Sequence, residues 1–149
     1  MPTQPVELLR FARTLDCRDE AACRAAISRA YYCAYHAALP IVAKLPPAAG
    51  YDVRDRIPHR QIADRLTNWK IPASWSKASK RAGNPALVAK QFRIALARRT
   101  RADYALGSAI LPAEVESQLQ RVALINAFMT RLKAALPAEF PATEKVDVA

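Results

Sequence analysis

The chain has 149 residues, a length typical of one domain built around a single core. Its composition, 52% hydrophobic with 3 glycines and 3 cysteines, is typical of a globular helical protein and excludes a collagen, a disordered chain and a disulfide-stapled miniprotein. With 23 basic and 13 acidic residues, the chain carries a charge of +10, which favours a polyanionic partner such as RNA, DNA or an acidic protein.

The positive charge is concentrated in the middle of the chain. Residues 54–101 contain thirteen Lys or Arg and two Asp, a net charge of +11, so the remainder is nearly neutral. This concentration favours an anion-binding surface. A solvated basic face without a ligand is the alternative interpretation.

The first two expected helices cover residues 6–15 and 20–39. The first is short and amphipathic. The second is rich in alanine, is capped by Asp16 or Asp19, and should end before Pro40. Hydrophobic periodicity gives this second helix one narrow stripe of mostly small side chains, formed by Cys23, Ile27, Ala30, Ala34, Ala38 and Ile41. The opposite face carries Arg29, Tyr32, Cys33 and His36, which we expect to line a second interface, within the bundle or between subunits.

A third helix is expected over residues 58–69, where Ile62, Leu66 and Trp69 recur at helical spacing. The loop that follows, residues 70–83, has four cations and no acid. Its residues Trp75, Lys77, Lys80 and Arg81 suit single-stranded nucleic acid, because the cations can follow a phosphate backbone while the indole stacks on a base. A tryptophan that folds back onto the bundle is an equal alternative.

The last two expected helices cover residues 84–106 and 112–136. Asn84 and Pro85 form a strong helix start, and Gly107 marks the helix end. Arg99 and Asp103 lie one turn apart on the same side and should form an ion pair. We expect residues 137–149 to be a frayed acidic tail.

These elements predict an all-α fold, an antiparallel bundle of four to five helices that forms one domain over residues 1–136. The three cysteines and two histidines lack the spacing of a zinc site, so we expect neither a metal nor another cofactor. No segment is long and apolar enough to span a membrane, and we expect a cytoplasmic protein with reduced thiols.

Three motifs resemble those of small bacterial HEPN-domain proteins. The run SRAYYCAYHAA, from Ser28, is similar to the early signature of that family, Ser-Arg-x-Tyr-Tyr-x-x-Phe-His-Ala. The run IPHRQIADRL around His59 resembles its short His-containing segment, and Arg98 with Arg101-Ala102-Asp103-Tyr104 resembles its Arg-x-x-Ala-Asp-Tyr element. The resemblance covers about residues 6–136.

The resemblance implies a helical homodimer that acts on RNA, often a metal-independent endoribonuclease of a toxin–antitoxin or antiphage defence system encoded beside a nucleotidyltransferase. In that chemistry an arginine holds the phosphate and a histidine moves protons during attack by the ribose hydroxyl. The chain departs from the family pattern because no histidine follows Arg101 at the usual position. The one literal match to the family's Arg-x(4 to 6)-His motif is Arg29 with His36, which two chains could bring together in a dimer.

The sequence therefore gives Arg29, His36 and Arg101 as candidate catalytic residues, and Arg98 with the four residues of the basic loop as candidate nucleic-acid contacts. The alternatives are structural. Arg29 and His36 can belong to a packed polar layer, with Arg29 paired to Asp103 or another acid. Arg98 and Arg101 can stay solvated. We expect His59 to cap its helix or lie in solvent, with a role in the cleft as the lesser alternative.

Two functions follow from these observations. The leading one is an HEPN-like, RNA-directed protein of a toxin–antitoxin or defence system, with endoribonuclease activity as an open question and an antitoxin or nucleotidyltransferase as its partner. The alternative is a non-catalytic helical dimer that binds nucleic acid or such a partner protein.

Overall fold

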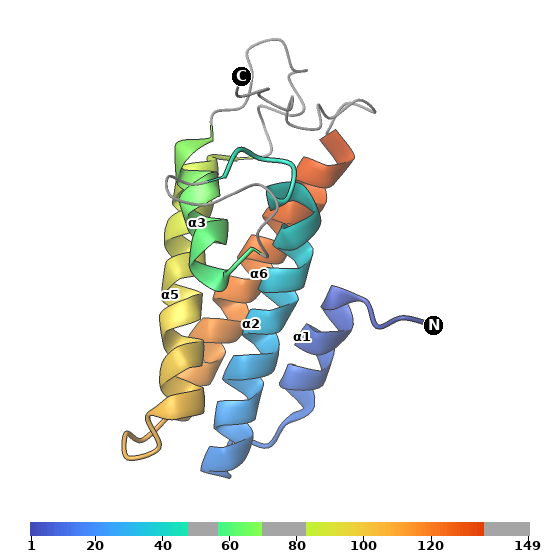
Figure 1. Cartoon of the computed structure of the whole chain (residues 1–149). Coiled ribbons are helices and arrows are strands. Elements are labelled where there is room, and N and C mark those ends of the chain that lie inside the picture. Colours follow the sequence, from blue (N-terminus) through green and yellow to red (C-terminus); the bar gives the residue numbers. More distant parts are fainter. Residues whose placement is uncertain (48–56, 70–82, 136–149) are drawn as a thin grey trace.

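The computed structural model describes residues 1–47, 57–69 and 83–135, and these residues form helices and no strand (Figure 1). The expected all-α bundle is confirmed, and each expected helix is present. The helices are α1 (Pro5–Thr14), α2 (Glu20–Val42), α3 (His59–Asn68), α5 (Pro85–Tyr104) and α6 (Pro112–Ala135).

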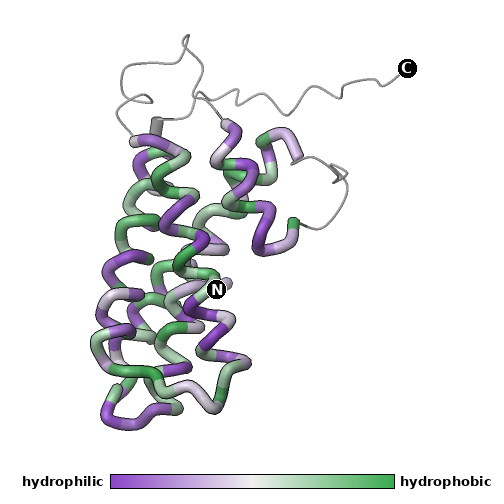
Figure 2. Tube along the Cα trace, turned by 90° about the vertical axis from the view of Figure 1, so that its left-hand side faces the viewer, coloured by the Kyte–Doolittle hydropathy of each residue, from purple (hydrophilic) through white to green (hydrophobic). Residues whose placement is uncertain are grey.

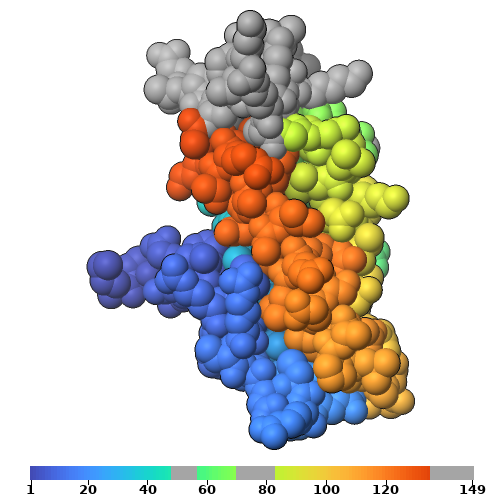
Figure 3. Space-filling model, turned by 180° about the vertical axis from the view of Figure 1, so that it is seen from behind, coloured from blue at the N-terminus to red at the C-terminus, as the bar shows by residue number. Residues whose placement is uncertain are grey.

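Helix α2 lies at the centre of the bundle and packs against each of the other four helices. Figure 1 shows α2, α5 and α6 as the long elements, with α5 antiparallel to both α2 and α6. The short α1 lies beside α2, and α3 packs mainly on α5. From behind, α6 lies between the α1–α2 pair and α5 (Figure 3).

The predicted stripe of α2 forms the middle of the core. All six of its members are buried, and four of them are Cys or Ala, so α5 and α6 can approach the α2 backbone closely. Figure 2 shows hydrophobic and hydrophilic residues alternating along the helices, as expected where each helix buries one face. Phe92 of α5 and Ile125 and Leu132 of α6 are buried in the same core.

The predicted caps begin α2 and α5, whereas two helix ends differ from the prediction. Helix α5 ends at Tyr104 with Ala105 as its C-cap, two residues before the expected end at Leu106 and Gly107. The Asp19 carboxylate accepts from the Ala21 amide (3.0 Å) and the Asn84 side chain accepts from the Ala86 amide (2.9 Å), as the sequence predicts. The prediction that α2 ends before Pro40 is wrong, because the helix continues to Val42. Proline removes one hydrogen bond of the last turn, and burial of Ile41 and Val42 offsets that loss.

Long-range contacts set the position of α3. Arg65, buried in α3, donates to the carbonyls of Val42 and Leu45 (3.2 Å each), which tie α3 to the C-terminal end of α2. The chain enters α5 through Gly83, whose φ of 125° favours glycine. A Cβ at this position would lie 3.0 Å from the Phe128 ring, so glycine also permits the close contact with α6.

Candidate nucleic-acid interface

The three segments that carry the HEPN resemblance meet on one side of the bundle. Tyr31 and Tyr32 come from the middle of α2, His59 from the first turn of α3, and Arg99 from the last turns of α5. The ring centroids of Tyr31 and Tyr32 lie 5.4 Å and 6.0 Å from that of His59. The Arg99 guanidinium lies 5.9 Å and 5.4 Å from the centroids of the same two tyrosine rings.

The His59 side chain contacts tyrosines instead of lying in solvent. Its Nδ1 lies 2.8 Å from the Tyr31 hydroxyl, and its ring centroid lies 4.5 Å from that of Tyr35. The Tyr35 hydroxyl donates to the carbonyl of Ile57 (3.2 Å), which fixes the chain just before His59. The expectation of a capping or solvated His59 is therefore wrong, because docking of α3 onto α2 half-buries this ring.

Tyr31 is fully buried, and burial raises the pKa of its phenol above the usual value. The hydroxyl is therefore protonated at neutral pH and can donate to Nδ1 of a neutral His59. In that arrangement the imidazole proton is on Nε2. Tyr31 thus orients the histidine that lines the groove between α3 and α5.

Arg99, which lies beside Tyr31 and Tyr32, is held by an ion pair and a hydrogen bond. Its Nε lies 2.8 Å from the Asp103 carboxylate, and its terminal nitrogen donates to the Tyr32 hydroxyl (2.9 Å). Burial opposes the charge of Arg99, but the neighbouring Tyr32 and Asp103 outweigh it and raise the pKa, so the guanidinium is charged. The predicted ion pair between Arg99 and Asp103 is confirmed.

The alternative pairing of Asp103 with Arg29 is wrong. Asp103 is occupied by Arg99, and the Ser28 hydroxyl also donates to it (3.4 Å). Arg29 is exposed on α2 and forms no ion pair within the described part of the chain.

A groove of about 1050 Å³ lies between α3 and α5. Its lining carries four arginines, one histidine and a single acid, Asp64, and that acid is paired with Arg93 (2.9 Å). The charged and aromatic lining residues are His59, Arg60, Asp64, Arg93, Arg99, Arg101 and Tyr104. Arg99 and Arg101 are also paired, with Asp103 and Glu114, so the arginines exceed these acids by one positive charge, which favours an anion.

Arg29 and His36, the candidate catalytic pair, lie outside this groove lining. His36 is exposed, and its ring stacks on Tyr32 with a centroid distance of 6.2 Å and an interplanar angle of 29°. It also meets the Tyr35 ring edge-on at 5.2 Å. Both residues lie on the surface of α2, where a second molecule can reach them, and their catalytic role stays a prediction.

Arg101 and Arg98 form bonds to Glu114 at the start of α6. Arg101 forms an ion pair with Glu114 and donates to the Ser108 hydroxyl (3.0 Å) and the Ala109 carbonyl (2.7 Å). Arg98 donates to the Glu114 carbonyl (3.5 Å). The alternative of solvated side chains is therefore wrong for both, since they are half-buried and bonded. Arg101 also lines the groove, and phosphate contact by either residue stays a prediction.

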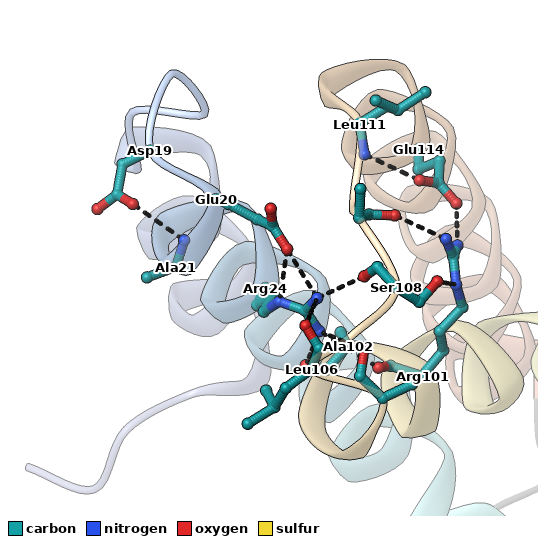
Figure 4. Close-up of polar contacts among 12 residues, drawn as sticks. Asp19, Glu20, Ala21, Arg24, Arg101, Ala102, Leu106, Ser108, Leu111 and Glu114 are labelled. Carbon is teal, nitrogen blue, oxygen red and sulfur yellow. Dashed lines mark hydrogen bonds and ion pairs between the residues drawn. The ribbon is translucent and has the colours of Figure 1, made fainter.

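Arg24 anchors the turn between α5 and α6, a role that the sequence did not reveal. Its guanidinium donates to the carbonyls of Ala102 (2.9 Å), Ala105 (3.3 Å) and Ser108 (2.5 Å) and pairs with Glu20 (2.7 Å). Figure 4 shows this cation between the first turns of α2 and the turn, with Arg101 holding the other side. The groove edge at the end of α5 is thus fixed by two arginines.

The remaining candidates, Trp75, Lys77, Lys80 and Arg81, and the expected tail, residues 137–149, lie outside the described residues. Within the described ranges, no group of three His, Cys, Asp or Glu side chains could hold a metal ion. In the same ranges, no helix is long and apolar enough to cross a bilayer. The three cysteines are free thiols.

Comparison of the chain with models of known protein families, with curated proteins and with solved structures found no match.

Proposed function

We propose that this protein binds RNA in the groove between α3 and α5, as an HEPN-like, RNA-directed protein of a toxin–antitoxin or defence system. The observation that carries the proposal is the groove lining, which has four arginines and one carboxylate, Asp64. Three of the arginines are ion-paired, Arg93 with Asp64 and Arg99 and Arg101 with Asp103 and Glu114, and the fourth, Arg60, leaves the groove with an excess of one positive charge. Phosphodiesters suit a row of arginines, because each guanidinium can contact two phosphate oxygens and a nucleic-acid strand presents its phosphates in a row. In this proposal the protein acts in the cytoplasm as a homodimer, beside an antitoxin or a nucleotidyltransferase.

RNA binding can be tested with groove variants and a matched control. Arg60→Gln and Arg93→Gln each remove one groove cation, whereas Arg131→Gln removes an exposed cation of α6. The affinity of wild-type protein for a labelled RNA oligonucleotide should fall steeply with salt, and the slope of log K against log salt should be shallower by about 0.7 for each phosphate that a variant no longer binds. The double variant should show this effect, and Arg131→Gln should behave as wild type.

Two results would contradict this proposal. One is equal affinity and equal salt slope in the wild type, the double variant and the control, because the RNA would then bind elsewhere. The other is no binding of RNA at low salt.

The proposal also includes cleavage of the bound RNA. The ribose 2′-hydroxyl attacks the adjacent phosphorus, loses its proton to a histidine and displaces the 5′-oxygen, which takes up a proton; the products are a 2′,3′-cyclic phosphate and a 5′-hydroxyl. His36 beside Arg29 is the candidate from the motif. His59 is a second candidate, since it lines the groove and is oriented by Tyr31.

The cleavage test uses total RNA or tRNA in EDTA, with analysis of the ends produced. Loss of cleavage in His36→Ala assigns proton transfer to the α2 pair, whereas loss in His59→Gln, with folding checked by circular dichroism, assigns it to the groove. Intact RNA with every variant and with the wild type excludes the nuclease function and leaves RNA binding.

The second candidate function is a non-catalytic module that binds a partner protein. Leu106 and Leu111 favour it, because they are 74% and 59% exposed on the turn that Arg24 and Arg101 hold. Exposed apolar side chains that gather in one patch are typical of protein interfaces. A partner whose affinity is flat with salt, and falls in Leu106→Ala, would support this function.

A further inference from the structure

Tyr104 lies at the edge of the groove with most of its surface exposed. It is the last residue of α5, it lines the groove, and it is 72% exposed. The other aromatic side chains of the cluster, Tyr31 and Tyr35, are buried, and Tyr32 is half-buried. Tyr104 is therefore the tyrosine ring in this cluster that a ligand can cover.

Arg99 contacts the Tyr104 ring. The guanidinium lies 5.7 Å from the Tyr104 ring centroid, and Asp103 and Tyr32 hold that guanidinium in place. Arg99 thus contacts the tyrosines on α2 and the exposed tyrosine at the groove edge. A ring supported in this way needs little ordering before a ligand stacks on it.

Two arginines line the groove that Tyr104 borders, so a ligand stacked on the ring can also contact positive charge. Arg60 and Arg93 line the same groove from α3 and α5. Arg93 precedes Tyr104 by eleven residues of α5, about 16 Å along the helix axis, so it can meet phosphates further along a strand whose base stacks on Tyr104. Cations beside an exposed aromatic ring are the usual arrangement in proteins that bind single strands, because each unpaired base offers a π-face. A duplex keeps its bases stacked on each other and offers this ring none.

The size of the groove points in the same direction. Its volume of about 1050 Å³ is comparable to that of pockets that hold drug-sized ligands, so it can take a few unstacked nucleotides. Proteins that bind double-stranded RNA contact it across successive grooves along about 16 base pairs, over a surface much longer than this.

We propose that the α3–α5 groove takes single-stranded RNA, with one unpaired base stacked on Tyr104 and phosphates further along the strand on Arg60 and Arg93. This inference rests on the proposed RNA binding and adds the class of RNA that the site selects. Selectivity comes from the stacking of the base, and affinity comes from the phosphates.

The test compares one oligonucleotide as a single strand and as a duplex, each bound to full-length protein and followed by fluorescence anisotropy at one salt concentration. The single strand should bind more tightly. Tyr104→Ala should weaken its binding roughly tenfold and leave duplex binding unchanged, because one base–aromatic stack is removed. Tyr104→Phe should behave as wild type. Leu106→Ala removes a similarly exposed side chain two residues away and should also have no effect.

A 2-aminopurine in the strand gives a direct readout of stacking. Its fluorescence should be quenched on binding to the wild type and to Tyr104→Phe, and less so with Tyr104→Ala. RNA binding that depends on Arg60 and Arg93 but is insensitive to Tyr104→Ala, or equal affinity for both forms of RNA, overturns this inference and leaves RNA binding intact. Absence of binding to either form, as expected if the groove takes a protein, overturns both.

Discussion

Glu114 shows how one carboxylate can serve two elements. Its side chain accepts from the Leu111 amide (2.9 Å), which caps the start of α6, and it pairs with Arg101 of α5. The Leu111 amide, and after it Arg101, holds the pKa of this carboxyl below its usual value. Because the folded protein favours the ionised form, Glu114 stabilises the fold at neutral pH.

This shift predicts a pH dependence of stability. In the range just below pH 4.5 the unfolded state binds more protons at this position than the folded state, so stability should fall as the pH falls. Urea unfolding of wild type and Glu114→Gln between pH 3 and pH 7 measures this. The variant should be less stable at pH 7, and the difference should shrink towards pH 3. Parallel curves would contradict the prediction.

The C-terminal end of α5 is bonded by a residue from another helix. Its C-terminal carbonyls, which an isolated helix leaves to water, are bonded by Arg24 of α2. The side chain of Arg24 is only 12% exposed, so these bonds are largely shielded from solvent. The turn between α5 and α6 is thus stabilised from outside its own sequence.

Arg24→Met keeps the aliphatic stem and removes the guanidinium. We expect a loss of about 2–3 kcal/mol in the free energy of unfolding, because hydrogen bonds from a charged donor are removed and their carbonyl acceptors are left unpaired. Hydrogen exchange should accelerate most at the amides of residues 105–111. Arg131→Met, at an exposed position of α6, serves as the control and should change neither quantity. If hydrogen exchange in Arg24→Met accelerated equally at all amides, the turn would not depend on this residue.

Contacts between near neighbours in sequence could be predicted, and contacts between distant helices could not. The helices, the caps Asp19 and Asn84 and the pair of Arg99 with Asp103 follow from periodicity and from spacings of up to four residues. The His59–Tyr31 contact joins residues 28 apart, and Arg24 reaches residues about 80 positions away. Such contacts depend on how helices dock, which no local pattern determines. The motifs were still informative, because the three segments that resemble one family are the segments that meet.

At the scale of the whole molecule, the net charge of +10 opposes folding as well as favouring anions. Cations such as Arg60 and Arg93 line one groove, and repulsion between like charges extends about 30 Å at 0.01 M salt but only about 8 Å at 0.15 M. Bound polyanion should relieve the same repulsion and stabilise the folded state by mass action.

We therefore expect the midpoint of urea unfolding to rise between 10 mM and 150 mM NaCl. At 10 mM NaCl, a single-stranded RNA oligonucleotide should raise the midpoint further, and 500 mM NaCl should abolish the RNA effect. A midpoint that falls with added salt would show instead that the ion pairs, such as those of Arg93 and Arg101, outweigh the repulsion.

The Arg24 anchor also has a consequence for the order of folding. Its bonds close a loop of about 80 residues, which is entropically costly early in folding. The α5–α6 hairpin must therefore reach its final geometry after α2 has docked, although its two helices are neighbours in the chain. In kinetic terms, Arg24→Met should mainly speed unfolding and leave the folding rate nearly unchanged.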